Sequence, residues 1–297
     1  MANVVLSEAE KAFILHGVED ELRLDGRSCK DYRPMELETD IVSHASGSAR
    51  LRLANTDVLA AVKTEIDTPN SETPNCGKIE FFVDCSANAT PAFEGRGGEE
   101  LAVELADTLA KAYESTSAFD LTTLCILTGQ QCWKLYVDVL ILECGGNLFD
   151  AVSLAVKSAL YNTKIPKVTA ALMDGGSCDL KLSDDPYDCT RINTEHIPIF
   201  VTICKIGDAC VIDPSAEETE CSSVSVVISV SQRDGKSFIT CTHMVGIGSL
   251  HPETLLKCIE MGISVSKCLD KTLMKTLKME ENRAELNGKR EIAGFLK

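Results

Sequence analysis

The stretch from Leu135 to Leu160 constrains the fold of this chain more than any other. It reads LYVDVLILECGGNLFDAVSLAVKSAL. An apolar run rich in Val, Ile and Leu leads to the pair Gly145 and Gly146. Beyond the pair, apolar residues recur at three- and four-residue spacing, namely Leu148, Val152, Ala155, Val156 and Ala159. The first pattern is typical of a buried strand and the second of a helix, so the stretch predicts a strand, a tight turn and a helix.

The same turn raises the question of phosphate binding. Backbone N–H groups at a helix start, next to glycines, form a common anion site, which usually includes a Lys or Arg side chain. Here no Lys or Arg lies between Lys134 and Lys157, Glu143 precedes the turn, and Asp150 falls in the first turn of the helix. A carboxylate at that position complements the helix dipole and repels phosphate. The turn therefore has the shape of a phosphate site without its charge.

Strand-like runs and helical patterns predict two halves with a similar plan. The runs lie at 48–55, 57–66 and 77–86, and again at 199–207, 209–213, 222–232 and 237–245. Helical patterns start after Ser7, which with Glu10 forms a capping box, at Glu99, and near Pro252, from where the last one runs toward Met279. The polar segment 280–297 is expected to fray or to dock on a partner. The plan favours an α/β (α+β) fold of mixed sheets, with helices packed against one face.

This plan also predicts the domain division. We expect an N-terminal helix and arm at 1–30, a first half at 31–200, and a second half at 201–297 that includes the C-terminal helix and tail. At 297 residues and 44% hydrophobic composition the chain can bury a sizeable core, either as one large domain or as two such halves. No run approaches the roughly 20 apolar residues that span a bilayer, so we expect no membrane partner.

The charge balance excludes a general affinity for nucleic acid. The formal net charge is −16, whereas binding to phosphates relies on Lys and Arg. Any RNA contact must therefore be local. Six of the ten arginines lie in the first hundred residues, where they could concentrate positive potential, although for each one alone an ordinary surface ion pair is the simpler interpretation. These six are Arg23, Arg27, Arg33, Arg50, Arg52 and Arg96.

Metal and disulfide chemistry find no support in the sequence. The 14 cysteines are scattered without a C-x-x-C motif, and the five histidines show no paired spacing. Many of the cysteines fall in apolar runs, which predicts buried, reduced thiols in a cytosolic or nuclear protein. We expect no metal and no cofactor.

An ordered set of motifs resembles the ribonuclease PH family. The set begins with the arm RLDGR (23–27) and the pair Tyr32 and Arg33, and continues through GSA (47–49) and NTDV (55–58). FEGRGGEE, DVLILECGGNLFDA and IDPSAEE follow in the family's order. No single motif is specific, but the set covers nearly the whole chain. The resemblance implies a ribonuclease PH-like fold of two related strand-strand-helix halves.

The resemblance also implies where an active site would lie. Active members of the family cleave RNA from its 3′ end with inorganic phosphate, which they hold at a Gly-Thr-Arg turn. This chain has Gly145, Gly146, Asn147 and Leu148 there, without the Thr hydroxyl or the Arg fork. An Asp that acts as an acid or holds a metal ion in active members is matched by Ser223. The nearby carboxylates Asp213, Glu217, Glu218 and Glu220 are interpreted as a solvated acidic loop rather than a metal cluster.

Arg96 is the one site residue that the resemblance retains. In the family, arginines in the loop before the first long helix touch the RNA backbone, and Arg96 lies between glycines that allow close approach. The alternative is an ion pair with Glu94, Glu99 or Glu100, and the sequence does not separate the two.

Three functions remain to be weighed. The first is a non-catalytic ring subunit of the RNA exosome core, which supports assembly and guides RNA for 3′-to-5′ processing and degradation. Its partners would be other ribonuclease PH-like ring subunits, cap subunits with RNA-binding domains, and RNA, in the nucleus, including the nucleolus, and in the cytoplasm. The second is an active phosphate-dependent 3′-to-5′ exoribonuclease. The third, an unrelated small-molecule binder on a similar fold, fits the ordered motifs least.

Overall fold

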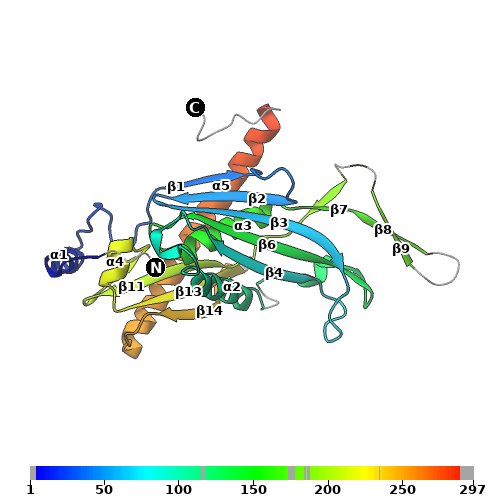
Figure 1. Ribbon diagram of the computed structural model, residues 1–297. Helices are drawn as coiled ribbons and strands as arrows, with labels where there is room; N and C mark the ends of the chain where they lie inside the picture. The colour runs from blue at the N-terminus through cyan, green and yellow to red at the C-terminus, as the bar shows by residue number, and fades with distance from the viewer. Residues whose placement is uncertain are drawn as a thin grey trace.

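The computed structural model describes residues 5–114, 118–172, 178–183, 185, 188–233 and 235–287. Figure 1 shows two sheets that lie one above the other, with helices between and around them. The helices are α1 (Glu8–Glu19), α2 (Glu99–Tyr113), α3 (Leu148–Asn162), α4 (Ala216–Cys221) and α5 (Pro252–Asn287). Short 3-10 turns lie at Pro91–Phe93 and Leu121–Leu124. None of the helices in the described ranges combines the length and the apolar character that a membrane crossing requires.

The first sheet is mixed and belongs to the N-terminal half. Its strand order is β1 (Met35–Thr39), β2 (Gly47–Leu53), β3 (Thr56–Asp67), β6 (Gln131–Glu143) and β4 (Lys78–Cys85), with β5 (Cys125–Leu127) also paired to β6. Strand β4 runs parallel to β6, and the other pairs are antiparallel. Side chains alternate along the strands, so one face of this sheet is buried and the other is partly exposed.

The second sheet is antiparallel throughout. Its order is β12 (Ala209–Ile212), β11 (Ile199–Ile206), β13 (Val224–Arg233) and β14 (Lys236–Val245). Two small strand pairs project from the body, β7 (Lys164–Pro166) with β10 (Cys189–Arg191), and β8 (Val168–Leu172) with β9 (Cys178–Leu182). The segment MDGGSCD (173–179), whose composition predicts a turn, lies mostly outside the described residues.

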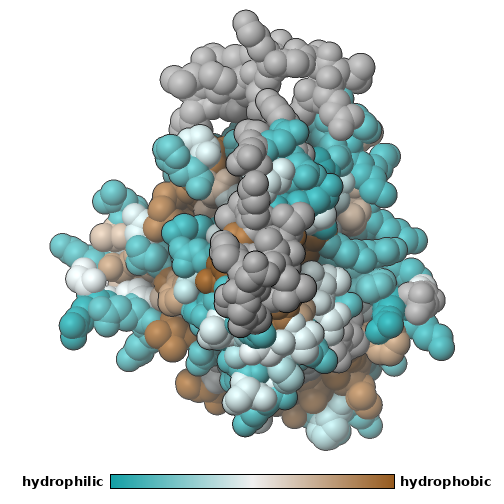
Figure 2. Space-filling model, turned by 90° about the vertical axis from the view of Figure 1, so that its right-hand side faces the viewer, coloured by the Kyte–Doolittle hydropathy of each residue, from teal (hydrophilic) through white to brown (hydrophobic). Residues whose placement is uncertain are grey.

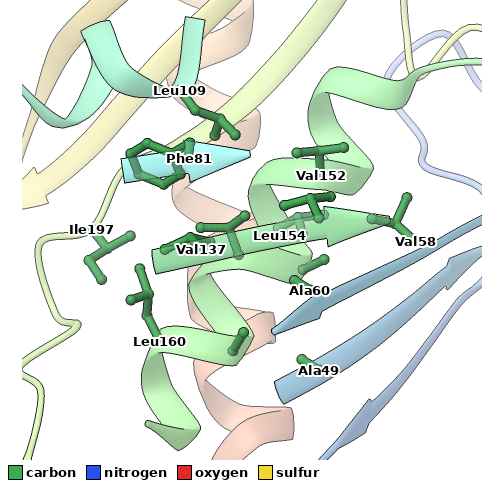
Figure 3. Close-up of a cluster of buried hydrophobic side chains, with 14 of the residues drawn as sticks. Ala49, Val58, Ala60, Phe81, Leu109, Val137, Val152, Leu154, Leu160 and Ile197 are labelled. Atoms are coloured by element: carbon green, nitrogen blue, oxygen red, sulfur yellow. The ribbon is translucent and has the colours of Figure 1, made fainter. Parts of the chain in front are cut away.

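Helix α3 fills the space between the two sheets. All of its residues from Leu148 to Leu160 are buried, including the polar ones. A helix that is buried on every side must pack between layers rather than on a surface. On one side it meets Val58 and Ala60 of the first sheet in the main hydrophobic core, which Figure 3 shows around Val152 and Leu154. The strand, turn and helix predicted at 135–160 are confirmed as β6 and α3.

The expectation that helices pack on only one face is wrong for the second sheet. Strands β11 and β13 are buried on both faces along most of their length. On the face away from α3, a second cluster joins Ile203 and Ile228 to Cys258 of α5. A Cβ added at Gly262 would lie 3.0 Å from Ile228 Cδ1, so α5 approaches the sheet closely here. Both faces therefore need a helix to exclude water.

A buried ion pair fastens the later part of α5 to α3. Lys157 Nζ lies 2.7 Å from Asp270 Oδ1 and donates a 2.6 Å hydrogen bond to the carbonyl of Ile197. The Lys157 side chain is 1% exposed, and burial lowers the pKa of Lys157, although Asp270 counteracts this shift. The helix continues beyond the expected Met279, and Glu281 accepts a hydrogen bond from Tyr161. Part of the segment predicted to fray thus belongs to α5.

Replacing Lys157 with Met should lower the free energy of unfolding by about 3–5 kcal/mol, because Asp270 would keep a buried charge without its partner. Lys11→Met at the exposed pair with Glu8 is the matched control and should cost less than about 1 kcal/mol. The measurement is urea denaturation followed by circular dichroism. The double variant Lys157→Met with Asp270→Leu should regain most of the loss; equal losses for Lys157→Met and the control would contradict this interpretation.

Candidate functional site

The turn between β6 and α3 is built from Gly145, Gly146 and Asn147. Gly146 has φ +102° and Asn147 has φ +51°, both in the left-handed region. A Cβ at Gly145 would lie 2.6 Å from Asn55 Cβ, and a Cβ at Gly146 would lie 2.7 Å from the backbone nitrogen of Ala216. These glycines are therefore required by the close packing of two backbone segments against the turn, independently of any anion.

Side chains from the N-terminal half hold the carbonyl groups of this turn. Arg33 donates from Nη1 to the carbonyl of Gly145 at 2.8 Å and from Nη2 to that of Gly146 at 3.1 Å. The Thr56 hydroxyl donates to the Gly146 carbonyl at 2.7 Å and accepts from the Gly145 N–H at 3.2 Å. The Arg33 guanidinium is thus directed at backbone oxygens and is engaged in the structure itself.

Asp213 neutralises Arg27 of the N-terminal arm and Arg33 of the first half. Its carboxylate accepts from Arg33 Nε and Nη2 at 3.0 and 2.9 Å, and from Arg27 Nη1 at 3.0 Å. Burial alone would raise the pKa of Asp213, but the hydrogen bonds and charge of Arg33 hold it below its ordinary value. The interpretation of Arg33 as an ordinary surface ion pair is wrong, because the residue is 7% exposed and lies between the two halves.

A second buried pair joins Arg23 to Glu218. Arg23 Nε lies 2.8 Å from Glu218 Oε1 and Nη2 lies 2.5 Å from Oε2, and both side chains are buried. Arg23 also donates to the carbonyls of Ile212 and Asp213. The prediction of a solvated acidic loop is therefore wrong for Asp213 and Glu218. They are buried because the arginines of the arm pair with them, a contact across some 180–195 residues that no local spacing reveals.

Asn147 connects this network to the start of α3. Its Nδ2 donates to Asp213 Oδ1 at 2.8 Å and to Asp150 Oδ2 at 2.9 Å. Both amide hydrogens are used, and Asn147 Oδ1 is a buried acceptor without a partner among the described residues. The position where active relatives are expected to carry a Thr hydroxyl thus holds an amide whose nitrogen donates to two carboxylates, while its oxygen has no partner among the described residues.

Asp150 links its own turn to two segments that are far apart from it in the chain. It accepts hydrogen bonds from the Tyr32 hydroxyl at 2.8 Å, from the Thr202 hydroxyl at 2.7 Å and from the Thr202 N–H at 3.1 Å, in addition to Asn147. Complete burial raises the pKa of Asp150 to about 6, against these hydrogen bonds, which lower it. Beside it, Ser153 Oγ accepts from the N–H of Phe200 at 2.9 Å.

These two side chains have a structural role at the edge of the second sheet. Strand β12 pairs only with Ile203–Ile206, so the first part of β11 has no strand partner on that side. Asp150 and Ser153 of α3 accept the N–H groups that a strand would otherwise bond. Asp150 therefore connects α3 to β11 through hydrogen bonds, in addition to any interaction with the helix dipole.

A small pocket with a volume of about 50 Å³ opens beside the turn. Its walls come from the second sheet, from α2, α3 and α4, and from the turn itself, and they are mostly apolar. The lining includes Gly146, Asn147, Leu148, Phe149, Val227 and Val245, with Glu220 as an acidic member. Gly146, Asn147 and Leu148, three of the predicted site residues, are thus brought together in one pocket.

Ser223 and Arg96 lie elsewhere. Ser223 is exposed, its N–H donates to the Lys205 carbonyl, and it is absent from the pocket lining, which includes Glu220 and Ser225 on either side of it. The Arg96 side chain is 89% exposed and lies 3.4 Å from Glu99 in a weak ion pair. Among the described residues, no group of three His, Cys, Asp or Glu side chains could hold a metal ion.

Comparison with known proteins identifies the family. The model of the 3′ exoribonuclease family, domain 1, matches residues 31–166, and the model of domain 2 of the same family matches residues 196–265. The chain belongs to the 3′ exoribonuclease, or ribonuclease PH, family. The ribonuclease PH-like fold expected from the sequence is thereby confirmed.

Relatives in the ribonuclease PH family match along almost their whole length. The chain is 33% identical to a Dictyostelium discoideum protein named "Putative exosome complex exonuclease RRP42", over 90% of this chain and 98% of that one. It is 34% identical to "Exosome complex component Rrp42" of Sulfurisphaera tokodaii, over 94% and 96%. Among solved structures, an archaeal exosome core aligns with TM-score 0.71 and 25% identity, covering 90% of this chain and 97% of that one. The Archaeoglobus fulgidus exosome with RNA bound to the active site aligns with TM-score 0.74 and 25% identity, over 89% and 98%.

Replacing Asp213 with Asn should lower the free energy of unfolding by about 3–5 kcal/mol, because Arg27 and Arg33 would lose the charge that neutralises them. Asp25→Asn is the control, since Asp25 pairs with the same Arg27 but is 43% exposed. That change should cost less than about 1 kcal/mol. Guanidinium chloride unfolding of the three proteins at pH 7 provides the comparison, and similar stability of Asp213→Asn and the parent would refute a structural role for the pair.

Proposed function

We propose that this chain is a non-catalytic, ribonuclease PH-like subunit of the core ring of an RNA exosome, at the position of the subunit called exosome component seven. The relatives named above as exosome components support the assembly. The proposed role is to complete the ring and to guide RNA toward a nuclease for 3′-to-5′ processing and degradation.

The observation that carries the proposal is the chemistry of the turn. A phosphate held there needs N–H donors, a hydroxyl and a cation. The turn instead has the acceptor Asn147 Oδ1, the apolar Leu148, and the carboxylates of Asp150 and Asp213 on either side of Asn147. Arg33 contacts the turn, but its hydrogen bonds are directed to two carbonyls and to Asp213. A phosphate would meet acceptors and negative charge rather than donors.

The missing acid group gives independent support. Ser223 cannot supply the acid chemistry or the metal ligation of the Asp that it replaces. With phosphate positioning and acid both absent, phosphoryl transfer loses its orientation and its charge stabilisation together. The alternative, an active phosphate-dependent exoribonuclease, is favoured by the word "exonuclease" in the name of the Dictyostelium relative. It would need a different arrangement at Asn147 and Leu148.

Apolar side chains on strand edges support assembly with related subunits. Phe82 on β4 is 51% exposed, and Phe238 and Met244 on β14 are 45% and 46% exposed. Both strands lie at the edge of their sheet. Figure 2 shows that hydrophilic residues cover much of one face, with hydrophobic ones gathered mainly toward its lower edge. Exposed apolar groups on unpaired edges are suited to permanent contacts such as those between ring subunits.

RNA contact is proposed for Arg96. Its side chain reaches into solvent from a glycine-rich loop, and the ion pair with Glu99 is long and exposed, so it is readily exchanged for a phosphate contact. The further proposed partners are the other ribonuclease PH-like ring subunits, cap subunits with RNA-binding domains, and RNA. The proposed location, nucleus with nucleolus and cytoplasm, rests on the resemblance alone.

The purified chain should release no nucleoside diphosphates from single-stranded RNA in the presence of inorganic phosphate, above the level of a mock preparation. Leu148→Arg should not restore release, because the carboxylates next to Asn147 and the absent acid group remain, and catalytic groups that act as a unit are not restored singly. Chromatography of the products gives the measurement. Phosphate-dependent release by the unaltered chain would establish the alternative function.

Arg96→Glu should weaken RNA capture by a ring reconstituted with its related subunits, to a similar extent for different RNA sequences. The slope of log affinity against log salt should fall by about one unit, because one phosphate contact is lost. Glu99→Gln is the matched control, which keeps the cation and removes its partner, and it should bind RNA at least as well as the unaltered ring. Assembly should be intact in both variants. Unchanged affinity and salt dependence for Arg96→Glu would show that Arg96 forms only its local ion pair and does not contact RNA.

A further inference from the structure

Two thiols from distant parts of the chain meet on the far face of the second sheet. Cys210 lies on β12 and Cys258 lies in the second turn of α5, 48 residues apart in sequence, with 3.7 Å between their Sγ atoms. They belong to the cluster that packs α5 on the sheet, on the opposite face from α3 and its turn. The pair is therefore separate from the site described above.

The two thiols differ in their surroundings. Cys258 is 1% exposed, whereas Cys210 is partly exposed on an edge strand. A hydrogen bond between the two thiols, in which either sulfur can be the donor, lowers the pKa of Cys210 to about 7 together with the charges of Lys205 and Lys257, although partial burial opposes this. The hydrogen bond to Cys210, followed by burial, raises the pKa of Cys258. Cys210 is thus suited to act as a nucleophile and Cys258 to react second.

We propose that Cys210 and Cys258 form a modification site at which a hydroperoxide converts the two thiols into a reversible disulfide. The Cys210 thiolate attacks one peroxide oxygen, the O–O bond breaks, and the other oxygen leaves as water or an alcohol after taking up a proton. Cys210 is then a sulfenic acid. The Cys258 sulfur attacks it, the S–S bond forms, and the hydroxyl group leaves as water with the proton of the Cys258 thiol. Two thiols are oxidised and one peroxide is reduced.

Local movement suffices for this step. A disulfide requires the sulfur atoms to approach from 3.7 Å to about 2.05 Å. Cys210 lies in the short edge strand β12, of which only one side is paired in the sheet. The bond would tie β12 covalently to α5 and shorten the loops available to the unfolded chain, which stabilises the folded state.

The surroundings of other thiols predict that the reaction is selective. Burial raises the pKa of Cys204 to about 12 and that of Cys85 to about 11, so these two are poor nucleophiles near neutral pH. Cys268 is exposed but lies on α5, ten residues beyond Cys258. The Sγ atoms of Cys210 and Cys258 are in contact, so a second thiol lies within reach of the one that is oxidised first.

The test treats the full-length reduced chain with a small excess of hydrogen peroxide and follows it by mass spectrometry. We expect a loss of two hydrogens per chain, a linked peptide pair that contains Cys210 and Cys258 after digestion without reductant, and full reversal by dithiothreitol. The melting temperature of the oxidised chain should rise by about 5–10 °C, which dithiothreitol also reverses.

Variants separate the two roles. In Cys258→Ser the sulfenic acid at Cys210 should persist and react with dimedone, whereas Cys210→Ser should lose both the linked peptides and most dimedone labelling. Cys268→Ser is the control and should behave as the unaltered chain. Failure to find the linked peptides in the unaltered chain, or peroxide oxidation that occurs first at other cysteines, would overturn the proposal. The search for linked peptides and the order of cysteine oxidation in the unaltered chain test the proposal even if a variant does not fold.

Discussion

The structure depends on the carboxylate of Asp213. This buried group accepts hydrogen bonds from Arg33, from Arg27 of the N-terminal arm, and from Asn147 at the turn before α3. An unpaired carboxylate would cost several kcal/mol at such a depth, and so would the unpaired arginines, so each group requires the others. Through Arg33 the same contact reaches the carbonyls of Gly145 and Gly146, so the two halves are joined at the turn between β6 and α3.

The charges at this joint are balanced by the protein itself. Arg23 pairs with Glu218, Arg27 and Arg33 pair with Asp213, and the glycines of the turn are required by the packing of Asn55 and Ala216. None of these constraints involves a substrate. The arm motif that carries much of the family resemblance is therefore explained by the architecture of the protein, and a chain can keep it while its turn presents acceptors in place of donors.

The sequence predicted the elements well, because hydrophobic periodicity is a local property. The strand, turn and helix at 135–160 follow from spacing alone, and so does the capped helix after Ser7. The residues that join the halves could not be predicted in this way. Arg23 and Glu218 are 195 residues apart, and nothing near either residue indicates its partner. The glycines predicted the shape of the turn. The contacts of Asn147 could not be predicted, because they depend on carboxylates that only the three-dimensional structure brings together.

The distance in sequence between Arg33 and Asp213 also governs how the protein can be made. The two are separated by 180 residues. A ribosome that adds about 5–20 residues per second needs roughly 10–40 seconds between them. During that interval the first sheet and α3 leave the ribosome before their partners. Arg33 then lacks Asp213, and the acceptors of Asp150 and Ser153 lack the N–H groups of β11. The N-terminal half must therefore stay soluble until β11 and the residues after β12 leave the exit tunnel. The part of the chain that is synthesised first thus completes its native contacts late.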